Sequence, residues 1–215
     1  PLTALSGFVE TLQGAAANDE IARKRFLEMM SNEADRMARL IGDLLSLSKL
    51  QASERVAPID RIDLFKILTS VSSSLSGLAT RNNIELNLNL SHSMPLVIGD
   101  SDELTQVFQN LIENAIKYSG TGSTVTVSFK PPKEGKSHLF ISVEDSGEGI
   151  GPAQIPRLTE RFYRVDKGRS RAQGGTGLGL AIVKHILIRH RGWLKISSQL
   201  GKGSIFAVYL PISKT

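Results

Sequence analysis

Residues 110–118 read Asn-Leu-Ile-Glu-Asn-Ala-Ile-Lys-Tyr, and a helix over this stretch would separate its polar from its apolar side chains. Positions i, i+4, i+7 and i+8 of a helix share one face. Those positions hold Asn110, Asn114, Lys117 and Tyr118. The other side carries Leu111, Ile112 and Ala115. The stretch therefore predicts a helix that packs on a core and presents a polar stripe.

The polar stripe fits a site for metal-bound phosphate. An Asn carboxamide oxygen is a neutral, hard ligand suited to Mg²⁺, and a lysine one turn further on suits phosphate charge. A solvated helix face with an incidental lysine fits the same residues equally well, because nothing else in this stretch decides between the two.

Helix and strand patterns alternate on both sides of this helix. Asp100 is placed to cap it, and Asp63 is placed to cap another helix at 64–81. Alternating apolar residues at 84–90 predict a strand with one buried face. Further patterns fit strands at 125–129 and 139–143, a helix at 178–189, and a hairpin at 193–197 and 204–210 that turns at Gly201–Gly203. We expect a mostly antiparallel or mixed sheet covered on one face by helices.

Residues 1 to about 51 read as two helices joined by a short polar link, in which Asn18 or Asp19 can cap the second helix. Apolar residues recur at heptad spacing at Leu2, Leu5, Val9 and Leu12, and again at Leu27, Met30, Ala34, Met37, Ile41 and Leu44. One such hairpin is too small for a core of its own, so we expect a homodimer built as a four-helix bundle. The alternative is a hairpin that packs on the rest of its own chain.

These patterns place the chain in the α+β class. We expect an N-terminal antiparallel helical hairpin over residues 1–57 and an α/β sandwich over residues 58–215, separated by the polar stretch that ends near Pro58. The chain opens inside a helical pattern at Pro1, so we expect the first helix to begin upstream of that residue.

Composition excludes several classes of protein. Of the 215 residues, 40% are apolar and 22% are charged, which is ordinary for a globular chain. The absence of cysteine excludes disulfides, thiolate zinc sites and a cysteine nucleophile. The net charge is +5, but no continuous basic stripe with interleaved aromatics is present, so we expect no nucleic-acid partner. No apolar run is long enough to span a membrane, and no secretory leader is visible, so we expect no membrane segment within these residues.

Three glycine-rich motifs follow the helix at 110–118. Residues 145–151 read Asp-Ser-Gly-Glu-Gly-Ile-Gly after a predicted strand, where a carboxylate can accept from an exocyclic amine such as that of adenine. Residues 174–180 read Gly-Gly-Thr-Gly-Leu-Gly-Leu at a predicted helix N-terminus, which favours an anion site but matches neither a P-loop nor a Rossmann fingerprint. Residues 201–204 read Gly-Lys-Gly-Ser within the last hairpin. Taken singly, each motif is also consistent with an ordinary turn.

Together and in order, these motifs resemble the N, G1, F, G2 and G3 boxes of sensor histidine kinases. The order is N-x3-N-x2-K-Y, D-x-G-x-G, E-R-F-Y-R, G-T-G-L-G-L and G-x-G-S. Such kinases share an ATP-binding fold with gyrase, the Hsp90 chaperones and the MutL repair proteins, and the heptad hairpin resembles their dimerisation and histidine-phosphotransfer domain. The stretch 2–49 also resembles the phosphate-starvation sensor kinases of bacteria.

The resemblance implies that the chain binds ATP and Mg²⁺. It identifies Asn114 with the metal-binding Asn, and Asn110, Lys117 and Tyr118 would lie beside the metal, phosphates or ribose. Asp145 would bind the adenine amine in a base pocket formed by Gly147, Gly149 and Ile150. The implied catalytic residues are Asn110, Asn114, Lys117 and Arg164.

The resemblance also implies a mobile lid over the phosphates, at about 161–174. Phe162 and Arg164 belong to the F box, and Arg164 would reach the terminal phosphate. Gly175, Gly177 and Gly179 would form the hinge of the lid, and Thr176 and Leu178 between them would belong to the nucleotide-binding residues. Lys167, Arg169 and Arg171 are expected to form a solvated loop, with steering of phosphate as the alternative.

The chain departs from the family at its start. Family members carry H-E-x-x-[TN]-P-L there, and only Pro1-Leu2-Thr3 stands at the matching place. The acceptor histidine would precede residue 1. The histidines present are His92, His138, His185 and His190, and none has the required setting. We therefore expect this polypeptide to bind ATP without phosphorylating itself at the usual position.

Asn110 favours a kinase over a water-using ATPase. Gyrase-like and Hsp90-like relatives place a Glu at this position, where it activates water, and an amide has no useful basicity near neutral pH. The γ-phosphate would then be kept for a histidine imidazole, which is partly neutral and nucleophilic near pH 7. A dimeric module that binds nucleotide and signals by shape, without phosphotransfer, is the alternative.

The resemblance also implies partners and a location. The phosphoryl group would pass from the histidine to an aspartate in the receiver domain of a response regulator, which docks on the bundle. The chain would be the cytoplasmic domain of a bacterial sensor anchored in the inner membrane.

Overall fold

A computed structural model describes residues 2–53, 56–131, 137–165 and 175–213 of the chain. Its elements are α1 (Leu2–Gln13), α2 (Glu20–Ser53), β1 (Asp60–Ile62), α3 (Leu64–Arg81), β2 (Glu85–Asn89), β3 (Val97–Gly99), α4 (Ser101–Tyr118), β4 (Thr124–Lys130), β5 (His138–Asp145), η1 (Ile155–Arg157), α6 (Gly179–Arg189), β6 (Trp193–Gln199) and β7 (Gly203–Pro211). Contacts divide the chain into one unit that contains α1 and most of α2, and another that holds both sheets. The predicted boundary at residues 57–58 stays a prediction.

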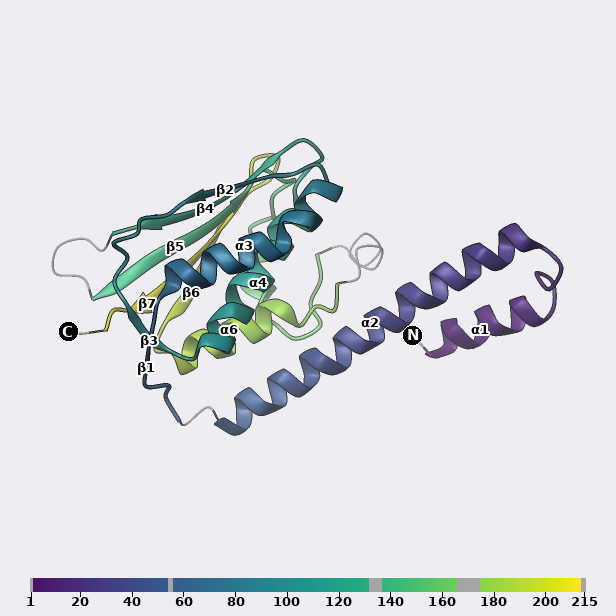
Figure 1. Cartoon of the computed structure of the whole chain (residues 1–215), viewed down its shortest axis with the longest axis horizontal. Helices are drawn as coiled ribbons and strands as arrows, with labels where there is room; N and C mark the ends of the chain where they lie inside the picture. Colours follow the sequence, from purple (N-terminus) through teal and green to yellow (C-terminus); the bar gives the residue numbers. More distant parts are fainter. Residues whose placement is uncertain (1, 54–55, 132–136, 166–174, 214–215) are drawn as a thin grey trace. The chain divides into compact units, whose positions relative to one another are not determined.

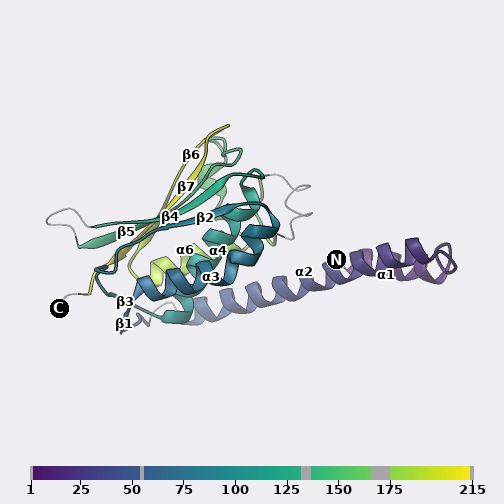
Figure 2. The ribbon, with the colours of Figure 1, turned by 45° about the horizontal axis from the view of Figure 1, so that its top comes forward.

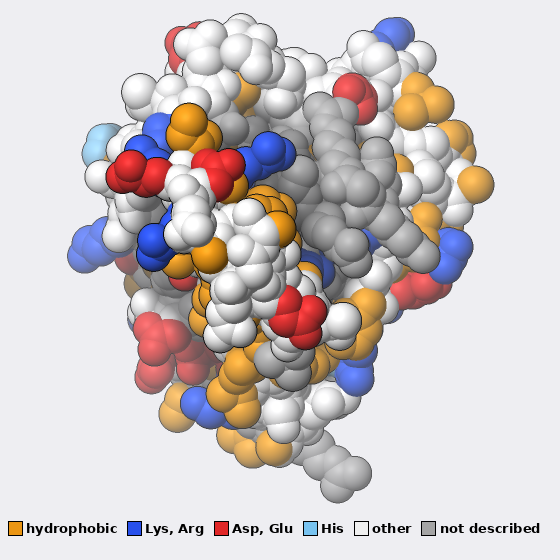
Figure 3. Space-filling view, turned by 90° about the vertical axis from the view of Figure 1, so that its right-hand side faces the viewer, with side chains coloured by type: hydrophobic (Ala, Val, Ile, Leu, Met, Phe, Trp, Pro, Cys, Tyr) orange, Lys and Arg blue, Asp and Glu red, His pale blue; other side chains and the backbone are white. Residues whose placement is uncertain are grey.

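Helices α1 and α2 form the predicted antiparallel hairpin (Figure 1). Asp19 caps α2, because its Oδ1 accepts from the main-chain N–H of Ala22 at 2.9 Å. The rings of Phe8 and Phe26 lie 5.8 Å apart and tie the two helices together. Figure 3 looks onto the end at which the helices are joined and shows hydrophobic side chains open to solvent between charged ones.

The larger unit is built on a five-stranded sheet in the order β2-β4-β5-β7-β6. β2 pairs with β4 in parallel, and the other neighbours are antiparallel, so the sheet is mixed as predicted. Helices α3, α4 and α6 cover one face of the sheet (Figure 2). The cross-strand pair Val143↔Phe206 points toward these helices, and both residues are buried.

Helix α4 lies against the middle of the core. Its buried side chains are Leu104, Val107, Phe108, Leu111, Ile112, Ala115 and Ile116, each at most 1% exposed. Asp100 caps the helix by accepting from the N–H groups of Asp102 and Glu103, and Asp63 caps α3 through Phe65. Both predicted caps are confirmed, and the apolar face of α4 is the one that the sequence predicted.

The structure adds elements that the sequence patterns did not predict. β1 and β3 form a separate two-stranded antiparallel sheet, with Asp60 opposite Gly99. The sequence predicted no strand between the linker that ends near Pro58 and the helix that begins at Leu64. Strands of three residues are too short to show an alternation. The predicted strand at 84–90 is shorter, and its Leu88 is 38% exposed, because β2 is an edge strand. Among the described residues, no helix is long and apolar enough to cross a membrane.

Candidate functional site

The polar stripe of α4 lies at the surface of the larger unit. Asn110, Asn114 and Lys117 are half-buried, and Tyr118 is 39% exposed at the last turn. The Lys117 ammonium lies 2.6 Å from the Glu113 carboxylate one turn earlier. Lys117 therefore has an ion-pair partner on its own helix, which a phosphate group would have to replace or share.

Asp145 ends the central strand β5 and begins the glycine loop. Its side chain is nearly buried at 6% exposure, and its Oδ1 accepts from the N–H of Gly147 at 2.9 Å. A Cβ on Gly147 would lie 2.3 Å from the carbonyl oxygen of Tyr118, so only glycine fits there. The loop thus presses against the C-terminal end of α4 and brings Asp145 close to the polar stripe.

The electrostatics of Asp145 are set by burial. Desolvation raises the pKa of this carboxyl above its usual value, because the charged form loses water. Hydrogen bonds from Gly147 and from the main chain and hydroxyl of Ser204 oppose that effect without cancelling it. A carboxylate with few water contacts is a strong acceptor for an amine donor that enters the site.

The glycine loop is held by the turn between β6 and β7. Gly149 has a φ of +71°, and a Cβ there would lie 2.1 Å from the carbonyl oxygen of Gln199. The N–H of Gly201 donates to the carbonyl of Glu148 at 2.7 Å. The glycine motifs at 145–151 and 201–204 therefore pack against each other and form a clasp around Asp145.

The N-terminus of α6 approaches the first residue of the polar stripe. A Cβ on Gly179 would lie 3.0 Å from Oδ1 of Asn110. Gly177, at a φ of +74°, accepts from the N–H of Phe162 at 2.8 Å, and Phe162 itself has a φ of +63°. Leu178 is the fully buried N-cap residue between the two glycines. The structure thus brings together predicted residues from α4, the F box and the start of α6.

Two predicted residues belong to the other unit, and most of the predicted lid is not described. Gly175 and Thr176 fall in the unit of the hairpin, in which the Thr176 hydroxyl donates to Asp43 Oδ2 at 2.6 Å. Arg164 is half-buried in the segment after η1. Most of the predicted lid, with Lys167, Arg169 and Arg171, lies outside the described residues.

A metal ion at this site would depend on few protein ligands. Among the described residues, no group of three His, Cys, Asp or Glu side chains could hold a metal. Mg²⁺ commonly binds through one or two protein oxygens together with phosphate oxygens and water. The Asn114 carboxamide on an open helix face fits that manner of binding.

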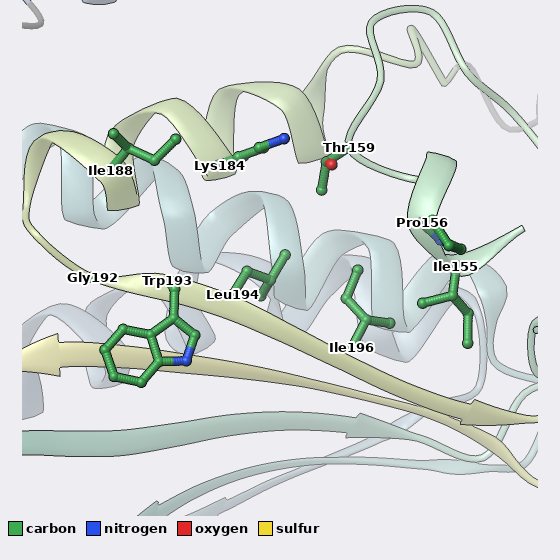
Figure 4. A pocket seen from close by; sticks show the side chains of 9 residues that line it. All are labelled: Ile155, Pro156, Thr159, Lys184, Ile188, Gly192, Trp193, Leu194 and Ile196. Atoms are coloured by element: carbon green, nitrogen blue, oxygen red, sulfur yellow. The ribbon is translucent and has the colours of Figure 1, made fainter.

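The same unit has a groove of about 340 Å³ between η1, α6 and β6 (Figure 4). Its lining is Ile155, Pro156, Thr159, Lys184, Ile188, Gly192, Trp193, Leu194 and Ile196. None of these belongs to the predicted nucleotide set, so this groove is separate from the site around Asp145.

Sequence reasoning missed two serines of the site. The sequence motif marked Ser204 only as part of a turn and predicted no partner for it. In the structure, its hydroxyl donates to the Asp145 carboxylate. Ser198 lies opposite Ser204 in the β6–β7 ladder, with the two hydroxyl oxygens 3.0 Å apart. No motif marks Ser198, and only the strand register could have found it.

Family models match both parts of the chain. Residues 99–214 match the model described as "Histidine kinase-, DNA gyrase B-, and HSP90-like ATPase", and residues 1–53 match "His Kinase A (phospho-acceptor) domain". The first match covers α4, α6, strands β4 to β7 and the glycine motifs described above, whereas α3 and β2 precede it.

Curated relatives include sensor kinases from several bacteria. The phosphate regulon sensor protein PhoR of Pseudomonas aeruginosa is 40% identical over 97% of this chain and 46% of its own length. Sensor-like histidine kinase SenX3 of Mycolicibacterium smegmatis is 40% identical over 98% of this chain and 54% of its own length. The chain thus spans about half the length of these relatives.

Solved structures share the fold. Histidine kinase AdeS of Acinetobacter baumannii has a TM-score of 0.76 at 25% identity, and the match covers 100% of this chain and 96% of AdeS. Histidine kinase ThkA in complex with response regulator protein TrrA has a TM-score of 0.78 at 21% identity, over 99% of this chain and 58% of that one.

Proposed function

Because this chain belongs to the histidine kinase-, DNA gyrase B- and HSP90-like ATPase family, as a sensor histidine kinase, we propose that it binds ATP around Asp145. The observation that carries the proposal is the buried carboxylate at the end of β5, clasped by glycines that admit no side chain. Asp145 would accept from the adenine amine, and Gly147, Gly149 and Ile150 would line the base.

The phosphates would extend from the base toward α4 and the N-terminus of α6. Free N–H groups and the helix dipole at Gly179 favour negative charge there. Asn114 would hold Mg²⁺, with Asn110 beside it, and the ion would supply charge neutralisation for the transferring phosphoryl group. Lys117 and Arg164 would contact phosphate. The Lys117 ammonium would then be shared between the phosphate and the Glu113 carboxylate.

The acceptor of the phosphoryl group would be a histidine rather than water. Asn110 stands where a carboxylate would have to act as the general base that activates water, and its carboxamide takes up no proton near neutral pH. A histidine immediately upstream of residue 1, on the first helix, would attack the γ-phosphate and expel ADP. The phosphoryl group would then move to an aspartate of a response regulator docked on the paired hairpins.

The assembly would be a homodimer at the cytoplasmic side of a membrane-anchored sensor. The relatives named PhoR and SenX3 support the kinase reading, and the complex of ThkA with a response regulator supports the kind of partner. The two functional regions would meet near residue 57.

Replacing Asn114 with alanine tests the site directly. We expect the Mg²⁺-dependent part of ATP affinity, measured by isothermal titration calorimetry with and without Mg²⁺, to be lost in Asn114→Ala. The matched control is Gln109→Ala, an exposed amide on the same helix. Unchanged ATP binding in Asn114→Ala would contradict the assignment.

A further inference from the structure

Ser198 joins three parts of the clasp through one hydroxyl group. Its Oγ accepts from the N–H of Ile150 at 2.7 Å and donates to the carbonyl of Gly203 at 2.8 Å. The same oxygen lies 3.0 Å from the hydroxyl oxygen of Ser204. Ile150 belongs to the glycine loop, whereas Gly203 and Ser204 begin β7, so the hydroxyl connects segments nearly 50 positions apart in the chain.

The donors and acceptors of this network fix its direction. A serine hydroxyl has one proton and two lone pairs. The Ser204 proton goes to the Asp145 carboxylate, so the single Ser198 proton is shared between the Gly203 carbonyl at 2.8 Å and the Ser204 oxygen at 3.0 Å. The Ile150 N–H already occupies one lone pair of Ser198. The hydrogen bonds therefore run from Ile150 through Ser198 and Ser204 to Asp145, and each polarises the next.

We propose that Ser198 is a positioning residue of the base pocket, which holds Ile150 and aims the Ser204 hydroxyl at Asp145. The inference deepens the proposed ATP site and rests on it. Without the Ser198 hydroxyl, the Ile150 N–H and the Gly203 carbonyl lose a partner in a half-buried place. The Ser204 hydroxyl also gains freedom to turn away from Asp145, which then holds the adenine amine less well.

The test compares nucleotides that differ in the base amine. ATP carries an exocyclic amine, and inosine triphosphate carries an oxygen in its place. Affinities of both would be measured by calorimetry with Mg²⁺ on the 215-residue chain and its variants. Ser198→Ala removes the hydroxyl, Ser198→Thr keeps it, and Ser197→Ala is the control on the opposite, exposed face of the strand.

We expect Ser198→Ala to weaken ATP binding about fivefold to tenfold, as expected for one lost neutral hydrogen bond. Binding of inosine triphosphate should change less than about twofold, since the phosphate contacts remain. The preference for ATP should therefore fall, and Ser198→Thr and Ser197→Ala should keep it.

Two results would overturn the inference. A Ser198→Ala chain that keeps the wild-type preference for ATP over inosine triphosphate would show that Ser198 does not act through Asp145, even if both affinities and the melting temperature fall. A wild-type chain that binds neither nucleotide would overturn the proposed function, and the inference with it. The first result leaves ATP binding by the wild type intact, so the two failures are distinguishable.

Discussion

Asp145 shows how a single residue can be costly to the fold and useful to the site. Burial raises the pKa of its carboxyl, so the folded chain holds that proton more tightly than the unfolded chain does. The stability that this preference contributes is present at low pH and is lost as the pH rises through the raised pKa. At neutral pH the ionised Asp145 therefore lowers the free energy of unfolding, while it supplies the acceptor that an adenine amine needs.

The variant Asp145→Asn should separate these two effects. Asparagine removes the buried charge and can still accept from Gly147, but its NH2 group cannot accept from Ser204, so the free energy of unfolding at neutral pH, measured by urea denaturation, should change little. ATP affinity should drop at least about tenfold, as expected for a charge-assisted hydrogen bond.

The pH dependence of binding provides a second readout for the same variant. The ATP affinity of the wild type, divided by that of Asp145→Asn at the same pH, should fall as the pH is lowered toward the ordinary aspartate pKa of about 3.9. The fall is expected because the Asp145 carboxylate, whose pKa is raised, takes up a proton. The division removes the titration of the ATP phosphates. A ratio that stays constant with pH would contradict a role for the ionised carboxylate.

Single residues were predictable where a motif marks them. Asp145 and Asn114 stand in spaced motifs, so the sequence named them, and the structure places their elements side by side through the contact of Gly147 with Tyr118. Ser198 lies in no motif. Its role depends on Ser204, the residue opposite it on β7, and therefore on the strand register. Strand register is decided by the whole sheet, and single-sequence patterns do not determine it.

Among the elements, α4 is held at its N-terminus by a cap and by side chains from the end of α6. Its N-terminus is capped by Asp100, whose main-chain N–H donates to Nε2 of His190 at 3.0 Å. Burial lowers the pKa of His190, which keeps the ring neutral and able to accept. Arg189 forms an ion pair with Glu103 of α4, so the end of α6 and the start of α4 are joined by side chains from both helices.

The cap of α4 can be tested by paired substitutions. Asp100→Ala removes the acceptor for the N–H groups of Asp102 and Glu103 and should lower the free energy of unfolding by about 1 kcal/mol. Asp100→Asn should cost little, because asparagine caps helices about as well. Equal losses for both variants in urea denaturation would mean that the charge, and not the cap, stabilises this end.

Elements were predictable in proportion to their length. The helix at 101–118 has a cap and apolar residues at helical spacing from Leu104 to Ile116, and it begins directly after the predicted cap Asp100. The pairing of β1 with β3 was not predictable, since three residues carry no period. Within the sheet, the parallel pairing of β2 with β4 depends on tertiary packing, which the alternation of apolar residues leaves open.

At the scale of the whole molecule, the hairpin leaves apolar side chains uncovered. Within the single chain, Leu27 and Ile41 are each 55% exposed, and Leu44 is 47% exposed, although they lie in the predicted heptad seam. An exposed apolar stripe with this period is typical of helices that pair with another copy. These values favour the dimer over a hairpin covered by its own chain.

A charge in the seam should break the dimer. Ile41→Glu places an ionised carboxylate where we expect the second copy to pack, so the mass in sedimentation at micromolar concentration should fall from dimer to monomer. Asn32→Glu adds the same charge at an exposed position outside the seam and should leave the mass unchanged. A wild-type chain that is monomeric under these conditions would rule out the bundle.

We propose that ATP bound at Asp145 and Asn114 serves to phosphorylate a histidine. The most direct measurement incubates two chains with γ-labelled ATP and Mg²⁺: the 215-residue chain, and one extended upstream by one or two helical turns. The readout is label on protein that survives base and is lost in acid, as expected for phosphohistidine. We expect label on the extended chain alone. If neither chain is labelled while both bind ATP, the kinase account is contradicted, and a nucleotide-gated dimeric module becomes the better description.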